Sequence, residues 1–385
     1  MATTPLAGQR PARTMLGTRA EAREAAHARV VRTHEPDYWL LVAIAALVVF
    51  GTVAIFSATF AIDLPAGGGS FYYLNRQLLF VALGAVAFFV TSRVDYHFWR
   101  RYSIPALVVA GVLLLLVLVP GLRVSAGGAH RWLNLGPLPQ FQPSELAKCA
   151  LILYMADWLC KRGPRLHDWR TGVLPFAFLL GGLIFLVMLE PDLGTSTLLA
   201  IIGITMFLVA GADLKQFALF IGSGALAFGA LAFAAPYRRD RLELFMKSEA
   251  ELARDLADGW QLYQARLSFG SGGWFGVGLG ASRLKYGWLP AAHTDAIFAV
   301  IGEELGLFGC ACLLALFLLL AVRGYRVAVR ARDPFGTLLA TGIVSWIVFQ
   351  ALINIGGITT TIPFTGVPLP FISYGGTSLI VVMAA

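Results

Sequence analysis

Between two strongly apolar parts of the chain lies a long, mostly polar segment, Ala235 to Thr294. It begins with Tyr237-Arg238-Arg239-Asp240-Arg241 and continues through Arg254-Asp255-Leu256-Ala257-Asp258-Gly259-Trp260-Gln261. The glycine run Gly270-Ser271-Gly272-Gly273 follows, and the segment closes on Leu289-Pro290-Ala291-Ala292-His293-Thr294. Polar and charged groups are costly in lipid, so a site built from them lies in water or in a polar cavity. This segment is the largest supply of such groups in the chain.

The composition of the 385 residues indicates a polytopic membrane protein. The chain is 58% hydrophobic and only 14% charged, whereas soluble domains carry about 25% charged residues. The net charge of +8 does not indicate nucleic-acid binding, because the basic residues follow the membrane topology described below. All four cysteines fall in apolar segments and show no disulfide or metal-ligand spacing.

Ten apolar segments are long enough to be membrane helices, each of which needs about 20 mainly apolar residues. The sequence therefore predicts an all-α polytopic membrane protein, in which a basic cytoplasmic tail, 1–37, precedes a transmembrane domain, 38–385. The predicted spans are 38–61, 76–92, 103–120, 144–160, 171–189, 194–211, 216–235, 295–322, 335–355 and 373–385.

The distribution of basic residues predicts the orientation of these spans. With the N-terminus inside, the cytoplasmic segments 1–37, 93–102, 161–170, 212–215 and 323–334 contain 18 Lys and Arg residues. The short outer loops then contain only Arg123 and Arg131. The loop 236–294 lies outside and carries eight basic residues, which is allowed because long loops are exempt from the charge rule.

Two segments rich in glycine or proline interrupt the helical pattern. Gly270 to Gly280 does not have the spacing of a nucleotide-binding loop, and we interpret it as a flexible turn. Pro363 to Gly376 cannot form a continuous helix, so we expect a re-entrant or cavity-lining loop.

Charged residues inside or beside the predicted spans are the first candidates for a site. Glu145 and Lys148 share one helix face, and they form either a structural ion pair or a place where a substrate phosphate meets Lys148. Glu303 lies about 12 Å into its span, together with Glu304. For these two carboxylates a structural role and a catalytic role remain equally open.

Other polar residues lie at the predicted membrane surface. Arg76 either snorkels to the interface or binds a lipid phosphate. Arg131, next to Trp132, matches the aromatic and basic pattern of an interface. Asp192 has the position of a helix cap.

Several of these stretches together match one family. They are His130-Arg131-Trp132, Phe141-Gln142-Pro143-Ser144-Glu145 with Lys148, Pro191-Asp192-Leu193-Gly194-Thr195, Leu289-Pro290 with His293-Thr294-Asp295, Gly302-Glu303-Glu304-Leu305-Gly306, and Pro368-Leu369-Pro370-Phe371-Ile372-Ser373-Tyr374-Gly375-Gly376. In these stretches the chain resembles the SEDS family (shape, elongation, division and sporulation), the FtsW/RodA peptidoglycan glycosyltransferases. The match runs from about residue 38 to 385 and agrees with ten spans.

The resemblance implies a polymerase of lipid II in the bacterial cytoplasmic membrane, active on its outer side beside a class B penicillin-binding protein. In the family an essential aspartate of the large outer loop precedes a Gly-Tyr-Gln-like sequence, here Gly259-Trp260-Gln261. This chain lacks the usual proline and is one residue shorter there, so Asp255 is the first candidate and Asp258 the second. The implied substrate-binding residues are Arg76, Arg131, Trp132, Gln142, Ser144, Glu145, Lys148, Asp192, His293, Asp295, Glu303, Ser373 and Tyr374.

The implied reaction joins a sugar hydroxyl to an anomeric carbon and releases undecaprenyl pyrophosphate. Asp255 would act as the general base. A cation would stabilise the leaving group, and Lys148, Arg76 and Arg131 are the candidates. A divalent cation such as Mg²⁺ or Mn²⁺ is a further candidate for that role, although no ligand cluster indicates its site.

Two other classes of function remain open from the sequence. A lipid flippase or transporter also has buried charges and broken helices, but the large one-sided loop favours an enzyme. A non-catalytic scaffold of the division or elongation machinery would use the basic tail and the outer loop as docking surfaces.

Overall fold

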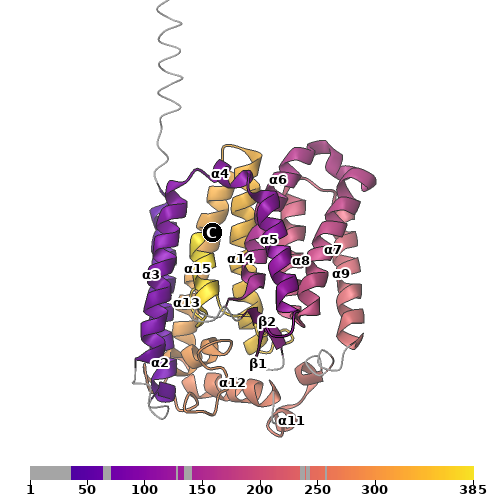
Figure 1. The fold of residues 1–385 in the computed structure, drawn as a ribbon. Coiled ribbons are helices and arrows are strands. Elements are labelled where there is room, and N and C mark those ends of the chain that lie inside the picture. Colours follow the sequence, from indigo (N-terminus) through magenta and orange to yellow (C-terminus); the bar gives the residue numbers. More distant parts are fainter. Residues whose placement is uncertain are drawn as a thin grey trace, which may run out of the picture. The chain divides into compact units, whose positions relative to one another are not determined.

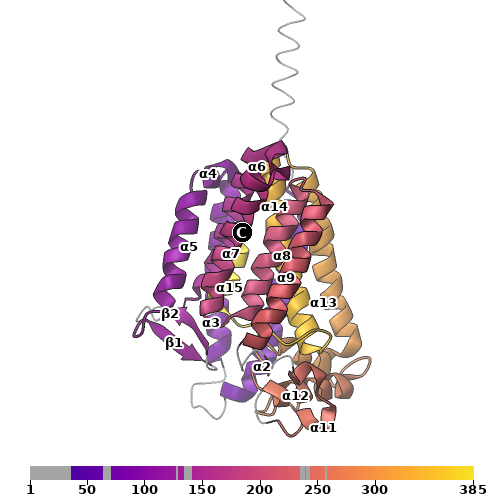
Figure 2. The ribbon, with the colours of Figure 1, turned by 90° about the vertical axis from the view of Figure 1, so that its right-hand side faces the viewer.

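The computed structural model describes residues 36–63, 71–126, 129–133, 141–234, 239, 243–255 and 258–385. Residues 39–385 form one compact unit, a helical bundle (Figures 1 and 2). The predicted tail, 1–37, lies outside the described residues except for its last two positions. The long helices are α2 (Tyr38–Asp63), α3 (Tyr72–Arg93), α5 (Ser103–Val117), α6 (Pro143–Arg162), α7 (Leu174–Leu189), α8 (Leu193–Val209), α9 (Leu214–Ala234), α13 (Ile297–Val329), α14 (Pro334–Ile358) and the shorter α15 (Gly376–Ala384).

Each of the ten predicted spans overlaps one of these helices, so the all-α polytopic fold is confirmed. Among the described residues, five helical segments are long and apolar enough to cross a membrane by length and composition: Tyr38–Phe60, Tyr72–Arg93, Trp169–Leu189, Ile297–Val329 and Pro334–Ile358. The helices α5 and α8 are apolar but shorter. The predicted boundaries are least accurate in the eighth span, because α13 continues beyond residue 322 to Val329.

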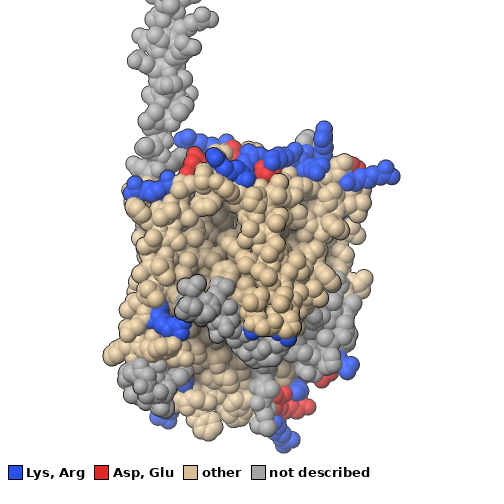
Figure 3. Space-filling view, viewed as in Figure 1, with Lys and Arg blue, Asp and Glu red and all other residues tan. Residues whose placement is uncertain are grey.

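The two ends of the bundle carry different elements. At one end lie the short helix α4 (Tyr96–Arg100) and the turns after α6, a 3₁₀-helix (Gly163–His167) and a π-helix (Trp169–Val173). Lys and Arg side chains gather along this end, and the middle of the face in view is almost uncharged (Figure 3). We call it the basic end. At the other end lie α11 (Glu249–Leu252), α12 (Asp258–Gly272) and the antiparallel strands β1 (Arg123–Ala126) and β2 (Ala129–Leu133) (Figures 1 and 2). We call it the α12 end.

Local sequence signals set the starts of three helices. Pro143 occupies the first turn of α6, where its missing N–H costs nothing. Asp192 caps α8 by accepting hydrogen bonds from the Thr195 N–H at 3.0 Å and from its hydroxyl at 2.9 Å. Asp333 caps α14 through the N–H groups of Phe335 and Gly336.

The helix α13 is broken at Gly306, where φ is +66° and ψ is −163°. The turn 273–278 fills this break with backbone hydrogen bonds. Val277 and Gly278 donate their N–H groups to the carbonyls of Glu303 and Glu304, and Leu307 and Phe308 donate theirs to Gly273 and Trp274. Groups that the helix leaves unpaired are therefore bonded within the protein, as membrane depth requires.

The glycine-rich turn thus has a packing role in addition to its turn conformation. Gly276 has φ +77°, and a Cβ there would overlap the backbone carbonyl of Glu304. Gly278 also has a positive φ, +106°, but a Cβ there would meet only Ala281 at 3.9 Å. Close backbone approach, besides conformational freedom, requires glycine at position 276.

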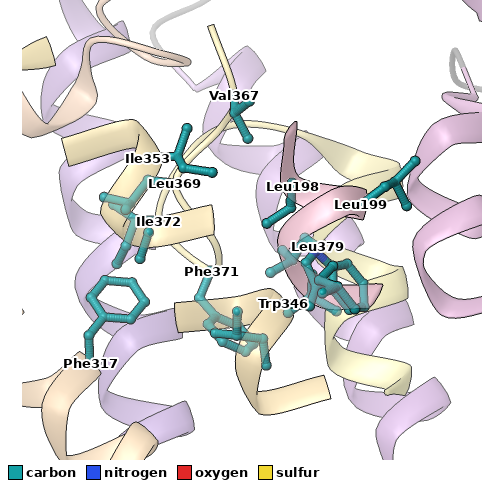
Figure 4. Close-up of a cluster of buried hydrophobic side chains, with 14 of the residues drawn as sticks. Leu198, Leu199, Phe317, Trp346, Ile353, Val367, Leu369, Phe371, Ile372 and Leu379 are labelled. Atoms are coloured by element: carbon teal, nitrogen blue, oxygen red, sulfur yellow. The ribbon is translucent and has the colours of Figure 1, made fainter. Parts of the chain in front are cut away.

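The segment Pro363 to Gly376 runs through the centre of the bundle without helical structure until α15 begins. Leu369, Phe371 and Ile372 are buried in a hydrophobic cluster that also contains Trp346 of α14 and Leu379 of α15 (Figure 4). Side chains of α14 bond its backbone, since Gln350 donates to the Pro368 carbonyl and Asn354 to the Val367 carbonyl. The structure therefore places this loop inside the protein, in agreement with the predicted break in the helix.

We expect Gly276→Ala to destabilise the protein more than Gly278→Ala does. Both changes put alanine at a positive φ, but only the first forces a side chain into the α13 backbone. Such overpacking costs about 1–3 kcal/mol. Thermal unfolding in detergent micelles measures the difference, and equal midpoints for the two variants would contradict the packing role of Gly276.

Candidate active site

The carboxylate of Asp255 lies at the α12 end, in the short stretch between α11 and α12. It is about one-fifth exposed, and its Oδ2 accepts a hydrogen bond from Lys247 Nζ at 2.9 Å. A Cβ at Gly259 would overlap the Asp255 side chain, so the glycine leaves room for the carboxylate beside the first turn of α12. Asp255 is thus held by Lys247 and still reaches solvent.

Lys247 is the charged partner that the sequence analysis did not nominate. The hydrogen bond to Asp255 raises the pKa of Lys247, and the nearby carboxylates of Glu243 and Glu251 add to that effect. A lysine eight residues before an aspartate gives no helical or strand pattern, so only the fold of this loop could show the pair.

The helix α11 lies between Lys247 and Asp255 in the loop that carries both residues. Ser248 and Glu251 form a capping box at its start, and hydrogen bonds from the Ser248 hydroxyl and N–H lower the pKa of Glu251. Leu252 is fully buried. Asp258, the second candidate base, is the first residue of α12, but its side chain lies outside the described part of the chain.

A second polar group joins β2 to the turn between α7 and α8. Arg131 Nη2 donates to the Pro191 carbonyl at 2.7 Å, and Arg131 Nε lies 3.6 Å from Asp192 Oδ2. Trp132, next in the strand, is half-buried and pairs with Val124 of β1. The predicted residues Arg131 and Asp192 thus come together, and Asp192 also has its expected capping role.

Glu190 belongs to the same turn and was missed by the sequence analysis. It is fully buried, and neither carboxylate oxygen has a hydrogen-bond partner. Burial, together with repulsion from Asp192, raises the pKa of Glu190 to about 8, while Arg131 opposes the shift. The sequence signal for Glu190 is its place in the triplet Glu190-Pro191-Asp192, of which only Asp192 was a candidate site residue.

The ion pair predicted in α6 is formed and completely enclosed. Lys148 Nζ donates to Glu145 Oε1 and to Gln350 Oε1, both at 2.8 Å, and lies 4.9 Å from the centre of the Trp346 ring. Both charged side chains are 1% exposed. The pair joins α6 to α14 with no access for solvent. Gln142 and Ser144, at the start of α6, bond each other at 3.0 Å.

An aromatic cluster brings two predicted residues from distant segments, His293 and Tyr374, together with Tyr73. Tyr73 of α3 lies 5.1 Å from the His293 ring and 5.2 Å from the Tyr374 ring. Arg76, one turn along α3, donates to the Tyr72 hydroxyl at 2.7 Å. Arg76 is only partly buried, and its guanidinium lies 5.5 Å from the centre of the Tyr72 ring and 6.0 Å from that of the Phe80 ring.

Backbone bonds fix the two loops that carry His293 and Tyr374. Tyr374 donates its N–H to the His293 carbonyl at 2.9 Å, and the Ser373 hydroxyl donates to the Thr294 carbonyl at 2.7 Å. The carbonyl of Asp295 accepts a hydrogen bond from Asn354 of α14. Ser373 and Asp295 therefore contribute to the position of this cluster through the backbone.

The adjacent glutamates of α13 hold the loop that follows α12. Glu303 accepts from the Ser282 hydroxyl and the Arg283 N–H, and Glu304 accepts from Lys285 at 2.8 Å and from Ser57 of α2 at 2.7 Å. Both carboxylates are buried. Of the two roles left open for them, the contacts seen here are structural.

No cluster of three or more His, Cys, Asp or Glu residues suited to a metal ion occurs among the residues that the structure describes. The charged groups described above are instead distributed over five places: Asp255 with Lys247, Arg131 with Asp192 and Glu190, Glu145 with Lys148, Glu303 and Glu304 with Lys285, and Arg76 beside the aromatic cluster.

Comparisons with known proteins indicate the family of the chain. Residues 38–385 match the family model described as cell cycle protein, which covers FtsW, RodA and SpoVE. The chain is 39% identical to the probable peptidoglycan glycosyltransferase FtsW of Trichlorobacter lovleyi over 92% of each protein. It is 38% identical to the stage V sporulation protein E of Bacillus subtilis over 91% of this chain and 94% of that one.

Solved structures show the same fold. A chain from a study of how a peptidoglycan synthase complex coordinates polymerisation and crosslinking superposes with a TM-score of 0.73 at 29% identity, over 90% of this chain and 94% of that one. The rod shape determining protein RodA of Thermus thermophilus gives a TM-score of 0.66 at 28% identity, over 91% and 94%. The fold, the motifs and the near-complete coverage together show that the chain belongs to the FtsW/RodA/SpoVE family of polytopic membrane proteins.

Proposed function

We propose that the protein is a peptidoglycan glycosyltransferase that polymerises lipid II into glycan strands. Family membership and the relatives named as glycosyltransferases support this activity. The observation that carries the proposal is the Asp255 carboxylate, partly exposed and held by Lys247 at the α12 end. It is a candidate base that remains in contact with solvent, whereas Glu145, Glu303 and Glu304 are enclosed.

The proposed reaction is a displacement at the anomeric carbon of a lipid-linked glycan. The 4-hydroxyl oxygen of the acceptor sugar forms a bond to that carbon as the bond from the carbon to the pyrophosphate oxygen breaks. Undecaprenyl pyrophosphate leaves with the electron pair, and the hydroxyl proton passes to Asp255. General-base assistance of this kind contributes roughly 10²–10⁴-fold to the rate.

Lys247 supports the role assigned to Asp255. A general base must be ionised before the reaction, and an ammonium within hydrogen-bond distance favours the charged form of a carboxylate. The pair lies partly in solvent, so its interaction is modest and Lys247 can move aside when the acceptor hydroxyl approaches.

The leaving pyrophosphate needs a cation that it can reach. Arg76 is the most accessible of the three predicted candidates, and it lies beside Tyr72 and the cluster of Tyr73, His293 and Tyr374. Arg131 is largely buried against Asp192. Lys148 is enclosed by Glu145, Gln350 and Trp346. We therefore assign the leaving-group role to Arg76, with Arg131 second, and a structural role to Lys148.

The proposal includes a location and a partner. The basic end, which contains α4 and the C-terminal end of α6, faces the cytoplasm, and the α12 end faces outward from the bacterial cytoplasmic membrane. The apolar surfaces of the spans bind the polyprenyl tail. The fold is similar to that of a chain from a peptidoglycan synthase complex that coordinates polymerisation with crosslinking. That similarity supports a crosslinking enzyme, a class B penicillin-binding protein, as partner.

The first rival class is a lipid II flippase, and the second is a scaffold. Purified protein with lipid II in detergent has no second compartment, so glycan polymer formed there means an enzyme. Because the proposal includes a penicillin-binding partner, the assay uses the protein co-purified with that partner.

Asp255→Asn should lower the rate of glycan polymerisation by about 10²–10⁴-fold, since it removes the base while keeping the shape of the side chain. The readout is the length distribution of glycan strands on a gel, with lipid II binding and partner co-purification as controls for folding. Asp258→Asn is the matched control. If Asp258→Asn is inactive and Asp255→Asn polymerises, the base is Asp258.

Lys247→Met should shift the acidic limb of the pH–rate profile to higher pH. Without the ammonium the Asp255 carboxylate takes up a proton more easily, so activity falls at a higher pH as the solution becomes more acidic. A partly exposed pair is worth about 0.2–1 kcal/mol, which corresponds to at most about fivefold in rate on that limb. Lys247→Arg should restore the profile.

Arg254→Met is the control for the Lys247 experiment, because it removes one positive charge from the same exposed loop. Its profile should match that of the wild type. A uniform loss at every pH in Lys247→Met would show that Lys247 serves only the folding of the loop.

Lys148→Met should destabilise the protein by about 3–5 kcal/mol, because it leaves the buried Glu145 carboxylate without its charged partner. The double change Glu145→Gln with Lys148→Met should recover most of the stability and of the polymerase activity. Thermal unfolding and the polymerisation assay measure both effects. If the double variant were fully stable but inactive, Lys148 would again be a candidate for a role in catalysis.

A further inference from the structure

Four large apolar side chains are exposed together where the turn 273–278 meets the break in α13. They are Trp274, Phe275, Leu307 and Phe308, with exposed fractions of 73%, 82%, 54% and 64%. We call them the Trp274 patch. Single exposed apolar residues are normal, but a contiguous group of this kind marks a surface that another apolar phase or molecule covers.

The backbone fixes the members of the patch to one another. Phe308 donates its N–H to the Trp274 carbonyl at 3.0 Å, and Leu307 donates to the Gly273 carbonyl at 2.9 Å. A Cβ at Gly306 would lie within 2.7 Å of the Phe275 nitrogen. The turn therefore has the same depth along the bundle as residues 307 and 308 of α13.

That depth follows from the length of α13. Its C-terminal end lies at the basic end, because Asp333, just beyond it, contacts Tyr96 and His97 of α4. Arg323 and Arg326 lie 15 and 18 residues after Phe308, or about 22 and 27 Å at 1.5 Å per residue. The hydrocarbon core is about 30 Å thick. If Arg323 or Arg326 lies at the edge of the hydrocarbon core on the side of the basic end, Phe308 lies within the core, near its opposite edge.

The patch also continues a surface that faces lipid. Leu314 and Leu318 follow Leu307 on the same face of α13, and both are exposed. The span that contains them is one of the five long apolar ones. The four members of the patch are themselves uncharged, and the N–H groups of Gly276, Leu307 and Phe308 are hydrogen-bonded.

We propose that the Trp274 patch inserts into the hydrocarbon of the leaflet at the α12 end, which makes the turn 273–278 a re-entrant element. The covering phase is lipid acyl chain, continuous with the lipid around α13. The C-terminal end of α12 is thereby fixed to the membrane. The inference depends on exposure and depth alone and does not require the proposed chemistry.

Spin labels at two positions test the insertion in vesicles. A label on Phe275→Cys should be relaxed several-fold more strongly by oxygen, which dissolves in lipid, than by a water-soluble nickel chelate. A label on Ala250→Cys, at an exposed position of α11, should show the reverse. Both are made in a background with the four native cysteines replaced by alanine, and thermal unfolding verifies the fold.

Either of two results at position 275 would overturn the proposal. Strong relaxation by the nickel chelate would place the turn in water. Protection from both reagents would mean that protein, either a partner helix or a second copy of the chain, covers the patch.

A second measurement needs no change to the cysteines. Lipids with brominated acyl chains should quench the fluorescence of the wild type more than that of Trp274→Phe, since Trp274 then contributes to the quenched signal. Trp260→Phe is the control, because the Trp260 indole is held by the Trp288 carbonyl. Equal quenching of the wild type and Trp274→Phe would exclude insertion.

Discussion

The constraint on which this structure depends is that backbone polar groups at membrane depth must be bonded by the protein itself. The chain breaks its helices in two places and meets the requirement in two ways. At Gly306 the turn 273–278 supplies the missing backbone partners of α13. In the loop 363–376 the side chains of Gln350 and Asn354 bond the carbonyls of Pro368 and Val367. Both solutions connect the α12 end to the centre of the bundle, so the loops there are extensions of its core.

The charged residues divide according to the same physics. Inside the bundle each described ion pair is closed: Lys148 is bonded to Glu145 and Gln350, and Lys285 to Glu304 and Ser57. Such pairs cost desolvation energy, which the attraction between the charges and the added hydrogen bonds offset. At the α12 end Asp255 has a charged partner and still contacts water. The general-base role that we propose for Asp255 requires that access, which separates Asp255 from the enclosed acids.

Particular residues show how far sequence reasoning reached within the site. Asp192 as a helix cap and Glu145 with Lys148 as a pair were accessible because both depend on spacings of three residues. Lys247 and Glu190 were missed for different reasons. The contact of Lys247 with Asp255 spans an irregular loop, and the unpaired state of Glu190 is a property of burial rather than of pattern. The meeting of Tyr73, His293 and Tyr374 depends on contacts across more than 200 residues, which one sequence does not specify.

The sequence by itself determined the fold class, the ten helical segments and their order, because apolar length and the spacing of turn residues are local properties. It also determined the motifs that place the chain in its family. The tertiary structure decided which charged groups are enclosed and which are accessible, since burial depends on what packs around a side chain. It also gave the glycine-rich turn its place in the break of α13. A run of glycines permits close approach to another backbone, but only the packed bundle determines which backbone that is.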